Sequence, residues 1–141
     1  MPMGSQALAD NVVPVYLCAR KILVVDDEPL IADLLADLLT LHGHIVQKSY
    51  SGAAALLIAR TFRPDVLISD VTMPGIDGVE TASQVRGYSP QCRVLLITAE
   101  VAAARFLLLN RPFSGQVEIV AKPVHSRQLL QTIAATPPPI H

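Results

Sequence analysis

The chain has 141 residues, of which 51% are hydrophobic and 16% are charged, and its formal net charge is −1. This length favours a single domain, and the apolar content argues against an intrinsically disordered chain. With 11 basic and 12 acidic side chains, the sequence lacks the basic excess of a protein that binds a nucleic-acid backbone.

The sequence carries no signal for a disulfide framework, a zinc site, export or a membrane span. Its two cysteines, Cys18 and Cys92, lie far apart and outside any CxxC pattern, which favours a reducing compartment. The longest uninterrupted hydrophobic run is Ala53–Ala59, far below the roughly 18 residues that cross a bilayer. We therefore expect a cytoplasmic protein without membrane contact or direct DNA binding.

Strands and helices are predicted to alternate along the chain. The apolar run Lys21–Val25 is typical of a strand buried on both faces, and Pro29 opens an amphipathic segment that Gly43 ends. Ser51 is the expected N-cap of the next helix. The predicted strands are Lys21–Val25, a second one that begins at Ile45, Val66–Asp70, Arg93–Thr98 and Val117–Ala121. The predicted helices are Pro29–His42, Ala53–Ala59, Asp77–Gly87, Val101–Asn110 and Ser126–Thr136.

Polar side chains are expected to meet at one edge of the predicted sheet. Five strand–helix units predict an α/β fold in which helices cover both faces of a parallel sheet, and such sheets bind ligands at the carboxyl ends of their strands. The side chains at these ends are Asp26, Asp27, Asp70, Thr98 and Lys122. Because three neighbouring carboxylates repel one another, they indicate a divalent cation such as Mg²⁺. With Lys122 beside them, they indicate a site for a phosphoryl group.

Four motifs at these strand ends carry a resemblance to a known family. They are Ile22–Pro29, Asp70–Gly78, Leu96–Ala99 and Ala121–Val124. Over about Lys21–Thr136 the chain resembles the receiver domains of two-component response regulators, the family of CheY. The resemblance implies a flavodoxin-like (βα)5 fold, a doubly wound parallel sheet of five strands in the order 2-1-3-4-5.

The resemblance also implies a role for each residue of the edge. Asp70 is expected to accept a phosphoryl group from the phosphohistidine of a sensor histidine kinase or phosphotransfer protein and to become an aspartyl phosphate. Lys122 is expected to pair with a phosphoryl oxygen, and Thr98 to hydrogen-bond the group after transfer. The implied Mg²⁺ ligands are Asp26, Asp27, Asp70 and the backbone carbonyl of Thr72. Pro123 matches a Lys-Pro bond that is often cis in the family.

These roles imply a signalling phosphoprotein in a phosphorelay and not an enzyme, since its only catalysis is its own phosphorylation and dephosphorylation. Thr72 and Glu100 are expected to flank the attacking water and to tune the lifetime of the phosphoryl group. The expected partners are the phosphodonor, an unidentified protein target and a second copy that binds through the fourth helix and fifth strand.

Two departures from the family pattern keep another function open. Ile119 stands where the family commonly has an aromatic ring that moves with Thr98, and the interval from Thr98 to Lys122 is slightly long. The alternative is therefore an atypical receiver that acts as a phosphorylation-independent binding or dimerisation module. A hydrolase or flavin protein on the same fold is a third hypothesis, which the absence of a glycine-rich phosphate loop disfavours.

Several side chains outside the motifs have an ordinary explanation and a functional one. His42 and His44 flank Gly43, and we expect a turn there in preference to a metal site. Cys92 is expected to be a small buried hydrophobe. The run Phe106–Leu109 covers too much of a helix surface to face one core, so it predicts either a helix covered by its loops or by the first twenty residues, or a partner surface.

The predicted domain is 21–136. Residues 1–20 form an N-terminal extension, either flexible or packed on the domain, and 137–141 form a C-terminal tail. The residues after Lys122 suffice for one helix and a tail, so the chain is expected to be a stand-alone receiver or one cut from a longer protein.

Overall fold

The computed structural model describes residues 19–111, 113 and 115–136. Most of the predicted N-terminal extension and all of the predicted tail lie outside these residues. The strands are β1 (Lys21–Val25), β2 (Ile45–Ser49), β3 (Val66–Asp70), β4 (Arg93–Thr98) and β5 (Val117–Ala121). The helices are α2 (Pro29–Leu41), α3 (Gly52–Phe62), α4 (Gly78–Tyr88), α5 (Val101–Leu109) and α6 (Ser126–Ala134). In this described part, no helix is long and apolar enough to cross a membrane.

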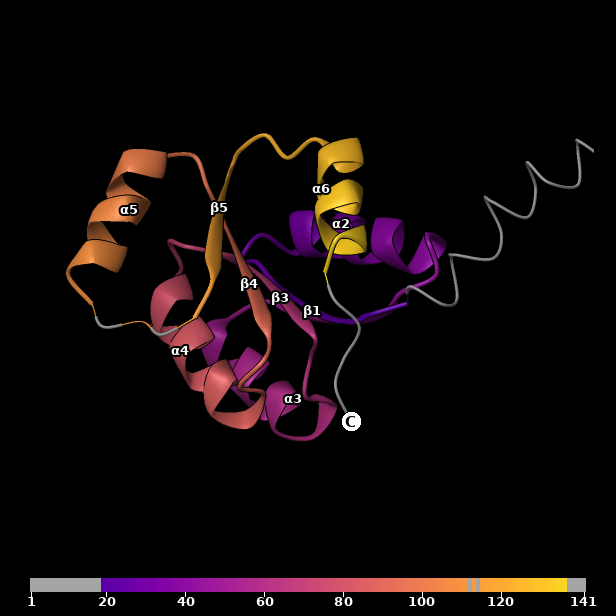
Figure 1. Cartoon of the computed structure of the whole chain (residues 1–141), viewed down its shortest axis with the longest axis horizontal. Coiled ribbons are helices and arrows are strands. Elements are labelled where there is room, and N and C mark those ends of the chain that lie inside the picture. The colour runs from indigo at the N-terminus through magenta and orange to yellow at the C-terminus, as the bar shows by residue number, and fades with distance from the viewer. Residues whose placement is uncertain (1–18, 112, 114, 137–141) are drawn as a thin grey trace, which may run out of the picture.

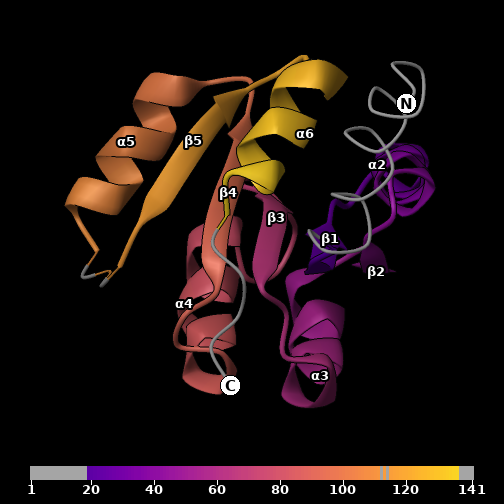
Figure 2. The same cartoon turned by 45° about the vertical axis from the view of Figure 1, so that its right-hand side comes forward.

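The strands form one parallel sheet in the order β2-β1-β3-β4-β5, which confirms the predicted fold. Helices α2 and α6 lie on one face of the sheet, and α3 and α4 lie on the other (Figures 1 and 2). Helix α5 runs beside β5, at one edge of the sheet (Figure 2). All five strands therefore point their carboxyl ends toward the same edge.

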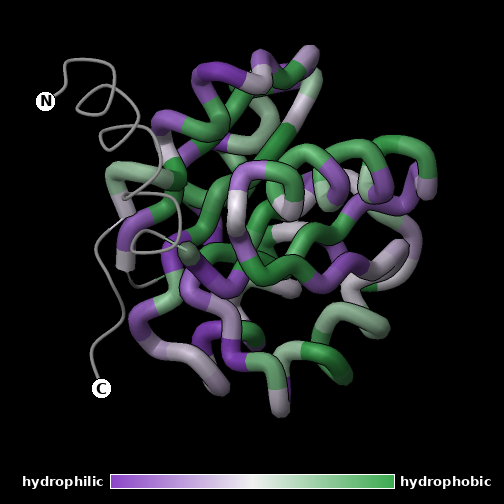
Figure 3. The backbone as a smooth tube through the Cα atoms, turned by 90° about the vertical axis from the view of Figure 1, so that its right-hand side faces the viewer, coloured by the Kyte–Doolittle hydropathy of each residue, from purple (hydrophilic) through white to green (hydrophobic). Residues whose placement is uncertain are grey.

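The core has two halves because successive strand residues face opposite sides of the sheet. In β1, Leu23 and Val25 pack with α3, α4 and α5, whereas Ile22 and Val24 pack with α2 and α6. All four side chains are at most 1% exposed. In Figure 3 hydrophobic and hydrophilic stretches alternate along the chain, as expected where apolar strands and helix faces are joined by polar loops.

The element boundaries differ little from the predicted ones. Ser51 caps α3 as predicted, since its hydroxyl accepts a hydrogen bond from the Ala54 N–H at 3.1 Å. Helix α3 continues beyond the predicted Ala59 to Phe62 and ends where Arg63 adopts a left-handed conformation with φ 49°. Helix α6 ends at Ala134, two residues before the predicted end.

The start of α4 lies directly against the end of β3. The Gly78 N–H donates to the Val71 carbonyl at 2.8 Å. A Cβ at Gly78 would lie 2.2 Å from the backbone oxygen of Asp70, so no side chain fits there without moving the backbone. This contact holds the loop of residues 71–77 close to the carboxyl edge of the sheet.

We expect Gly78→Ala to lower the free energy of unfolding by about 1–3 kcal/mol, the usual cost of forcing a methyl group into a packed site. Gly87→Ala is the matched control in the same helix, because a Cβ there meets nothing within 4 Å. It should leave stability unchanged or raise it by up to about 1 kcal/mol through helix propensity. Urea unfolding of both variants measures the difference, and equal effects would contradict the close approach at Gly78.

Candidate functional site

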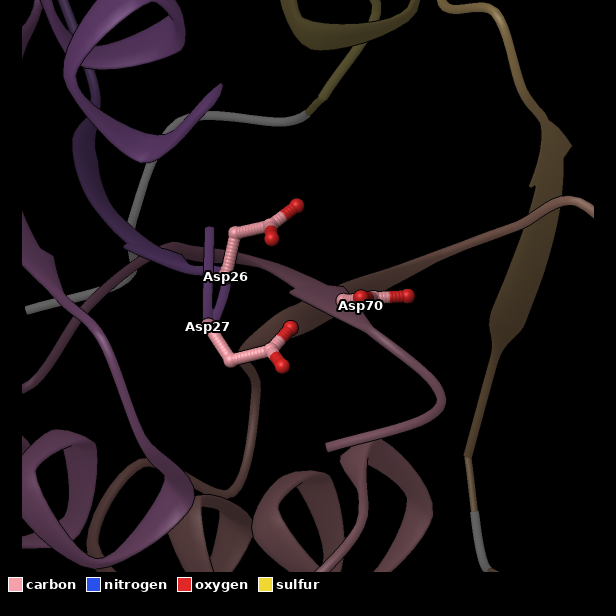
Figure 4. A group of neighbouring side chains, drawn as sticks. All are labelled: Asp26, Asp27 and Asp70. Atoms are coloured by element: carbon pink, nitrogen blue, oxygen red, sulfur yellow. The ribbon is translucent and has the colours of Figure 1, made fainter. Parts of the chain in front are cut away.

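Three carboxylates gather at the carboxyl edge of the sheet. Asp26 and Asp27 directly follow β1, Asp70 is the last residue of β3, and these two strands are neighbours in the sheet. Figure 4 shows the three side chains beyond the strand ends. One carboxylate oxygen of each lies within 4.8 Å of the others. The structure thus brings together the predicted acidic residues.

Burial makes two of these carboxylates costly to ionise. Asp26 is 1% exposed and Asp70 is 8% exposed, whereas Asp27 is exposed. Desolvation raises the pKa of Asp26 and of Asp70 above the usual range, and the neighbouring carboxylates add to the rise. The Asp26 side chain also accepts a hydrogen bond from the Glu28 N–H at 2.9 Å, which opposes this shift.

Lys122 brings a positive charge to the same point. Its Nζ lies 3.4 Å from Asp70 Oδ2 and 3.8 Å from Asp26 Oδ2. The lysine directly follows β5, and its backbone N–H donates to the Thr98 carbonyl at 2.8 Å. The Lys122–Pro123 peptide bond is cis, as the family pattern led us to expect. A single lysine leaves the group of three carboxylates with an excess of negative charge.

This donor set fits a small hard cation. Carboxylate oxygens are the ligands that Mg²⁺ prefers, and Mg²⁺ keeps several positions for water and phosphoryl oxygens. Asp27, which is exposed, offers its carboxylate from the solvent side. Thr72 lies in the loop after Asp70 and lines the same cavity as Asp70 and Lys122.

Thr98 closes the site from β4. It is the last residue of that strand and is 6% exposed. Its hydroxyl oxygen accepts the Glu100 N–H at 2.9 Å, so its own O–H remains able to donate elsewhere. A cavity of about 330 Å³ lies between these residues and α5. Its lining includes Asp70, Thr72, Thr98, Ala103, Leu107 and Lys122.

The remaining predicted features lie away from this cavity. The His44 ring nitrogen accepts the Arg20 N–H at 3.1 Å, and a His42 ring nitrogen lies 3.0 Å from the Leu38 carbonyl. Among the described residues, only Asp26, Asp27 and Asp70 form a group of three or more potential metal ligands, so the histidine pair lacks a third.

The structure also shows the environment of Cys92 and of the run Phe106–Leu109. Cys92 is 2% exposed, and burial raises the pKa of its thiol to about 12, as expected for an inert core residue. In α5, Phe106 and Leu109 are 64% and 85% exposed, so the described loops do not cover them. Leu107 and Leu108 pack against the core.

One charged residue near the site has no counterpart in the sequence analysis. Arg111, just beyond α5, forms an ion pair with Asp77, the N-cap of α4. Nothing in the local sequence marks this pairing, because the two residues meet only after α4, β4 and α5 have folded between them. The slightly long interval from Thr98 to Lys122 indicates an unusual connection here but does not identify Arg111.

Comparisons with known proteins identify the family to which this fold and its acidic edge belong. A family model of the response regulator receiver domain matches residues 22–134. The chain is 35% identical to the response regulator protein FleR of Pseudomonas aeruginosa over 116 residues, which are 82% of this chain and 24% of FleR. It is 33% identical to the response regulator MprA of Mycobacterium tuberculosis over 116 residues, 82% of this chain and 49% of MprA.

Solved structures show the same relationship. The chemotaxis protein CheY4 of Vibrio cholerae matches with a TM-score of 0.72 and 28% identity, over 84% of this chain and 99% of that one. The receiver domain of the hybrid histidine kinase CckA matches with a TM-score of 0.68 and 31% identity, over 80% of this chain and 94% of that one. The chain belongs to the receiver domain family of two-component response regulators. It spans between about a quarter and a half of the length of FleR and MprA.

The raised pKa of Asp70 predicts a pH-dependent cost of folding. Without divalent cations, Asp70→Asn should be more stable than the native chain at pH 7, because the asparagine carries no buried charge. The difference should shrink as the pH falls through the raised pKa toward the ordinary value, since the native carboxyl then becomes protonated. Urea unfolding in EDTA at several pH values measures it, with exposed Asp37→Asn as the control. A difference that grows toward low pH would contradict the assignment.

Proposed function

We propose that this chain is a Mg²⁺-dependent phosphoacceptor of a two-component phosphorelay, phosphorylated on Asp70 by the phosphohistidine of a histidine kinase or phosphotransfer protein. The observation that carries this proposal is the position of Asp70. Its carboxylate ends β3 at the rim of a cavity, with Lys122 Nζ 3.4 Å away and two further carboxylates beside it. Under this proposal the receiver unit is 21–136, with 1–20 as an extension and 137–141 as a tail.

The chemistry needs a nucleophile and compensation of charge. An Asp70 carboxylate oxygen attacks the phosphorus of the donor, the P–N bond breaks, and the donor imidazole leaves with the electron pair. Phosphoryl transfer depends on positioning and charge stabilisation more than on covalent help from the protein. When bound by Asp26, Asp27, Asp70 and the Thr72 carbonyl, Mg²⁺ supplies positive charge to the phosphoryl oxygens. Lys122 supplies a second positive charge on the side of β5.

After transfer, the neutral hydroxyl of Thr98 has a new acceptor within the same cavity. Its oxygen already accepts the Glu100 N–H, so its proton is free to be donated to a phosphoryl oxygen. Formation of that bond draws the β4–α5 loop toward Asp70. Glu100 and Thr72 are exposed and line the cavity, and we propose that they affect the water that hydrolyses the acyl phosphate.

The output is proposed to be a protein contact. Phe106 and Leu109 expose apolar surface on α5, beside β5 (Figure 2). The two side chains are three positions apart and so lie on one face of the helix, and a contiguous exposed apolar patch is typical of an interaction surface. We propose that this face binds a second copy of the chain or the downstream target, and that the module signals through such contacts without enzymatic turnover.

One observation favours a second candidate function, a receiver whose contacts do not depend on phosphorylation. Ile119 lies in β5 opposite Leu96 and is partly buried against the core. As a β-branched residue it is stiff about χ1, and it has no ring to move between a buried and an exposed position. The α5 surface is then available in both states of Asp70.

Phosphorylation tests the first function directly. Incubation with Mg²⁺ and acetyl phosphate should add the mass of one phosphoryl group to the native chain and none to Asp70→Asn. Lys122→Gln should slow the reaction by about 10²-fold, because a charge that stabilises the transferring group is lost. Intact mass spectrometry over time measures both.

The oligomeric state of the same samples separates the two functions. A change in size-exclusion volume on phosphorylation supports the first, whereas a constant dimer supports the second. If neither acetyl phosphate nor a phosphorylated histidine kinase modifies the chain, the phosphoacceptor function is wrong.

Metal binding has its own prediction. At a Mg²⁺ concentration ten times its dissociation constant, the native chain should gain about 1.4 kcal/mol of stability, because the ion binds only the folded state. Asp27→Asn should lose most of this gain, whereas Asp37→Asn, exposed on α2, should keep it. Thermal unfolding with and without Mg²⁺ measures the difference. An equal gain in both variants would remove Asp27 from the proposed ligand set.

A further inference from the structure

A two-point ion pair joins the segment after α5 to the start of α4. Arg111 donates from one guanidinium nitrogen to Asp77 Oδ1 at 2.8 Å, and its other terminal nitrogen lies 2.7 Å from Asp77 Oδ2. Such a planar pairing fixes orientation as well as distance, which a lysine does not. Both side chains remain partly exposed, at 38% and 24%, so solvent screens the pair and it can open.

Asp77 stands at the end of the loop that leaves the phosphoacceptor. Its carboxylate also caps α4, since Oδ1 accepts the Glu80 N–H at 2.9 Å. The next residue, Gly78, donates its N–H to Val71 and approaches the backbone of Asp70 too closely to accommodate a Cβ. We therefore expect a displacement of Asp77 to move the backbone of Asp70 as well.

The N-terminal part of helix α5 lies beside the phosphoacceptor site. It begins three residues after Thr98, and Ala103 and Leu107 line the cavity beside Asp70. Arg111 follows the end of the helix by two residues. The near end of α5 is thus tied to the site through Thr98, and its far end is tied to the site through Arg111 and Asp77.

A second arginine attaches the same segment to α4. Arg86, in the last turn of α4, donates to the Gln116 carbonyl and lies over the ring of Phe113, 4.8 Å from its centroid. Its Nε also donates to the Cys92 carbonyl at 3.0 Å. The segment between α5 and β5 is therefore held to α4 at both ends of that helix.

We propose that Arg111 is a positioning residue for the phosphoacceptor site, which holds Asp77 so that the loop after Asp70 and the far end of α5 respond together to the state of Asp70. This inference rests on the proposed phosphoacceptor function. The Arg111–Asp77 pair connects Asp70 with the exposed surface of Phe106 and Leu109. This connection does not require an aromatic ring at position 119. The connection runs through helix α5 as a rigid element whose two ends are both attached to the site.

The test follows hydrogen–deuterium exchange of the full chain with and without Mg²⁺ and beryllofluoride, a mimic of the phosphoryl group. In the native chain, the ligand should slow amide exchange in the loop 71–77, at the start of α5 and in the last turn of α5. In Arg111→Gln, the slowing in that last turn should fall by about threefold or more, while the slowing at the start of α5 persists. Equal slowing in the last turn of both proteins would overturn the proposal.

Three further variants separate positioning from general stabilisation. Arg111→Lys keeps the charge and should restore the response in part. Asp77→Asn retains an oxygen that can cap α4 but loses the ion pair, and combining it with Arg111→Gln should have no more effect on the response than either change alone. Arg105→Gln, an exposed arginine of α5 that forms no ion pair with any described residue, is the matched control for loss of charge. Additive effects of the two single changes, or the same loss in Arg105→Gln, would overturn the proposal.

The phosphoacceptor function is checked on the same samples. If the native chain takes up a phosphoryl group from acetyl phosphate and Arg111→Gln transmits the response normally, only the role of Arg111 is wrong. If the native chain takes up neither beryllofluoride nor a phosphoryl group from acetyl phosphate or a phosphorylated histidine kinase, both the proposed function and the role of Arg111 are wrong.

Discussion

The structure depends on one electrostatic constraint, the crowding of three carboxylates at the carboxyl edge of a parallel sheet. Parallel strands are buried on both faces, so side chains that end neighbouring strands share a region with little water. Burial raises the pKa of Asp26 and Asp70, and Lys122 is the one cation paired with them among the described residues. Ionising these buried carboxylates costs free energy, and Lys122 alone neutralises them only in part. The site therefore favours the binding of a cation, which is the physical basis of the proposed function.

The fold serves this edge in two ways. The core on both faces of the sheet holds the strand ends in place. The close packing of Gly78 against the Asp70 backbone keeps the loop after Asp70 next to the sheet. Helix α5 is less enclosed, since it covers an edge strand and exposes Phe106 and Leu109. The molecule therefore combines a buried site for chemistry with an exposed apolar surface for contacts. Such an arrangement suits a signalling domain, in which the state of a buried group must alter an exposed one.

The contacts of α5 and β5 hold this edge of the sheet without an aromatic ring at residue 119. Ile119 is partly buried against the core, and it has no aromatic ring that could move between a buried and an exposed position. The segment between α5 and β5 is instead attached to α4 through Arg86 and Arg111. Both arginines use several donors at fixed angles, so each of them holds position more strictly than a single hydrogen bond does.

The parallel strands and their polar ends were predictable from local patterns in the sequence, whereas the strand order 2-1-3-4-5 was implied by the resemblance to receiver domains. A short apolar run followed by Asp or Lys defines a buried strand and its polar end, and parallel strands place those ends together. The exact ends of α3 and α6, the exposure of Phe106 and the pairing of Arg111 with Asp77 were not predictable in this way. They depend on which residues meet after distant segments pack, and neither hydrophobic period nor turn chemistry encodes contacts between side chains 34 positions apart. The sequence by itself determined the fold class and the location of the acidic residues, whereas the tertiary structure decided which of their charges are buried and how α5 is connected to them.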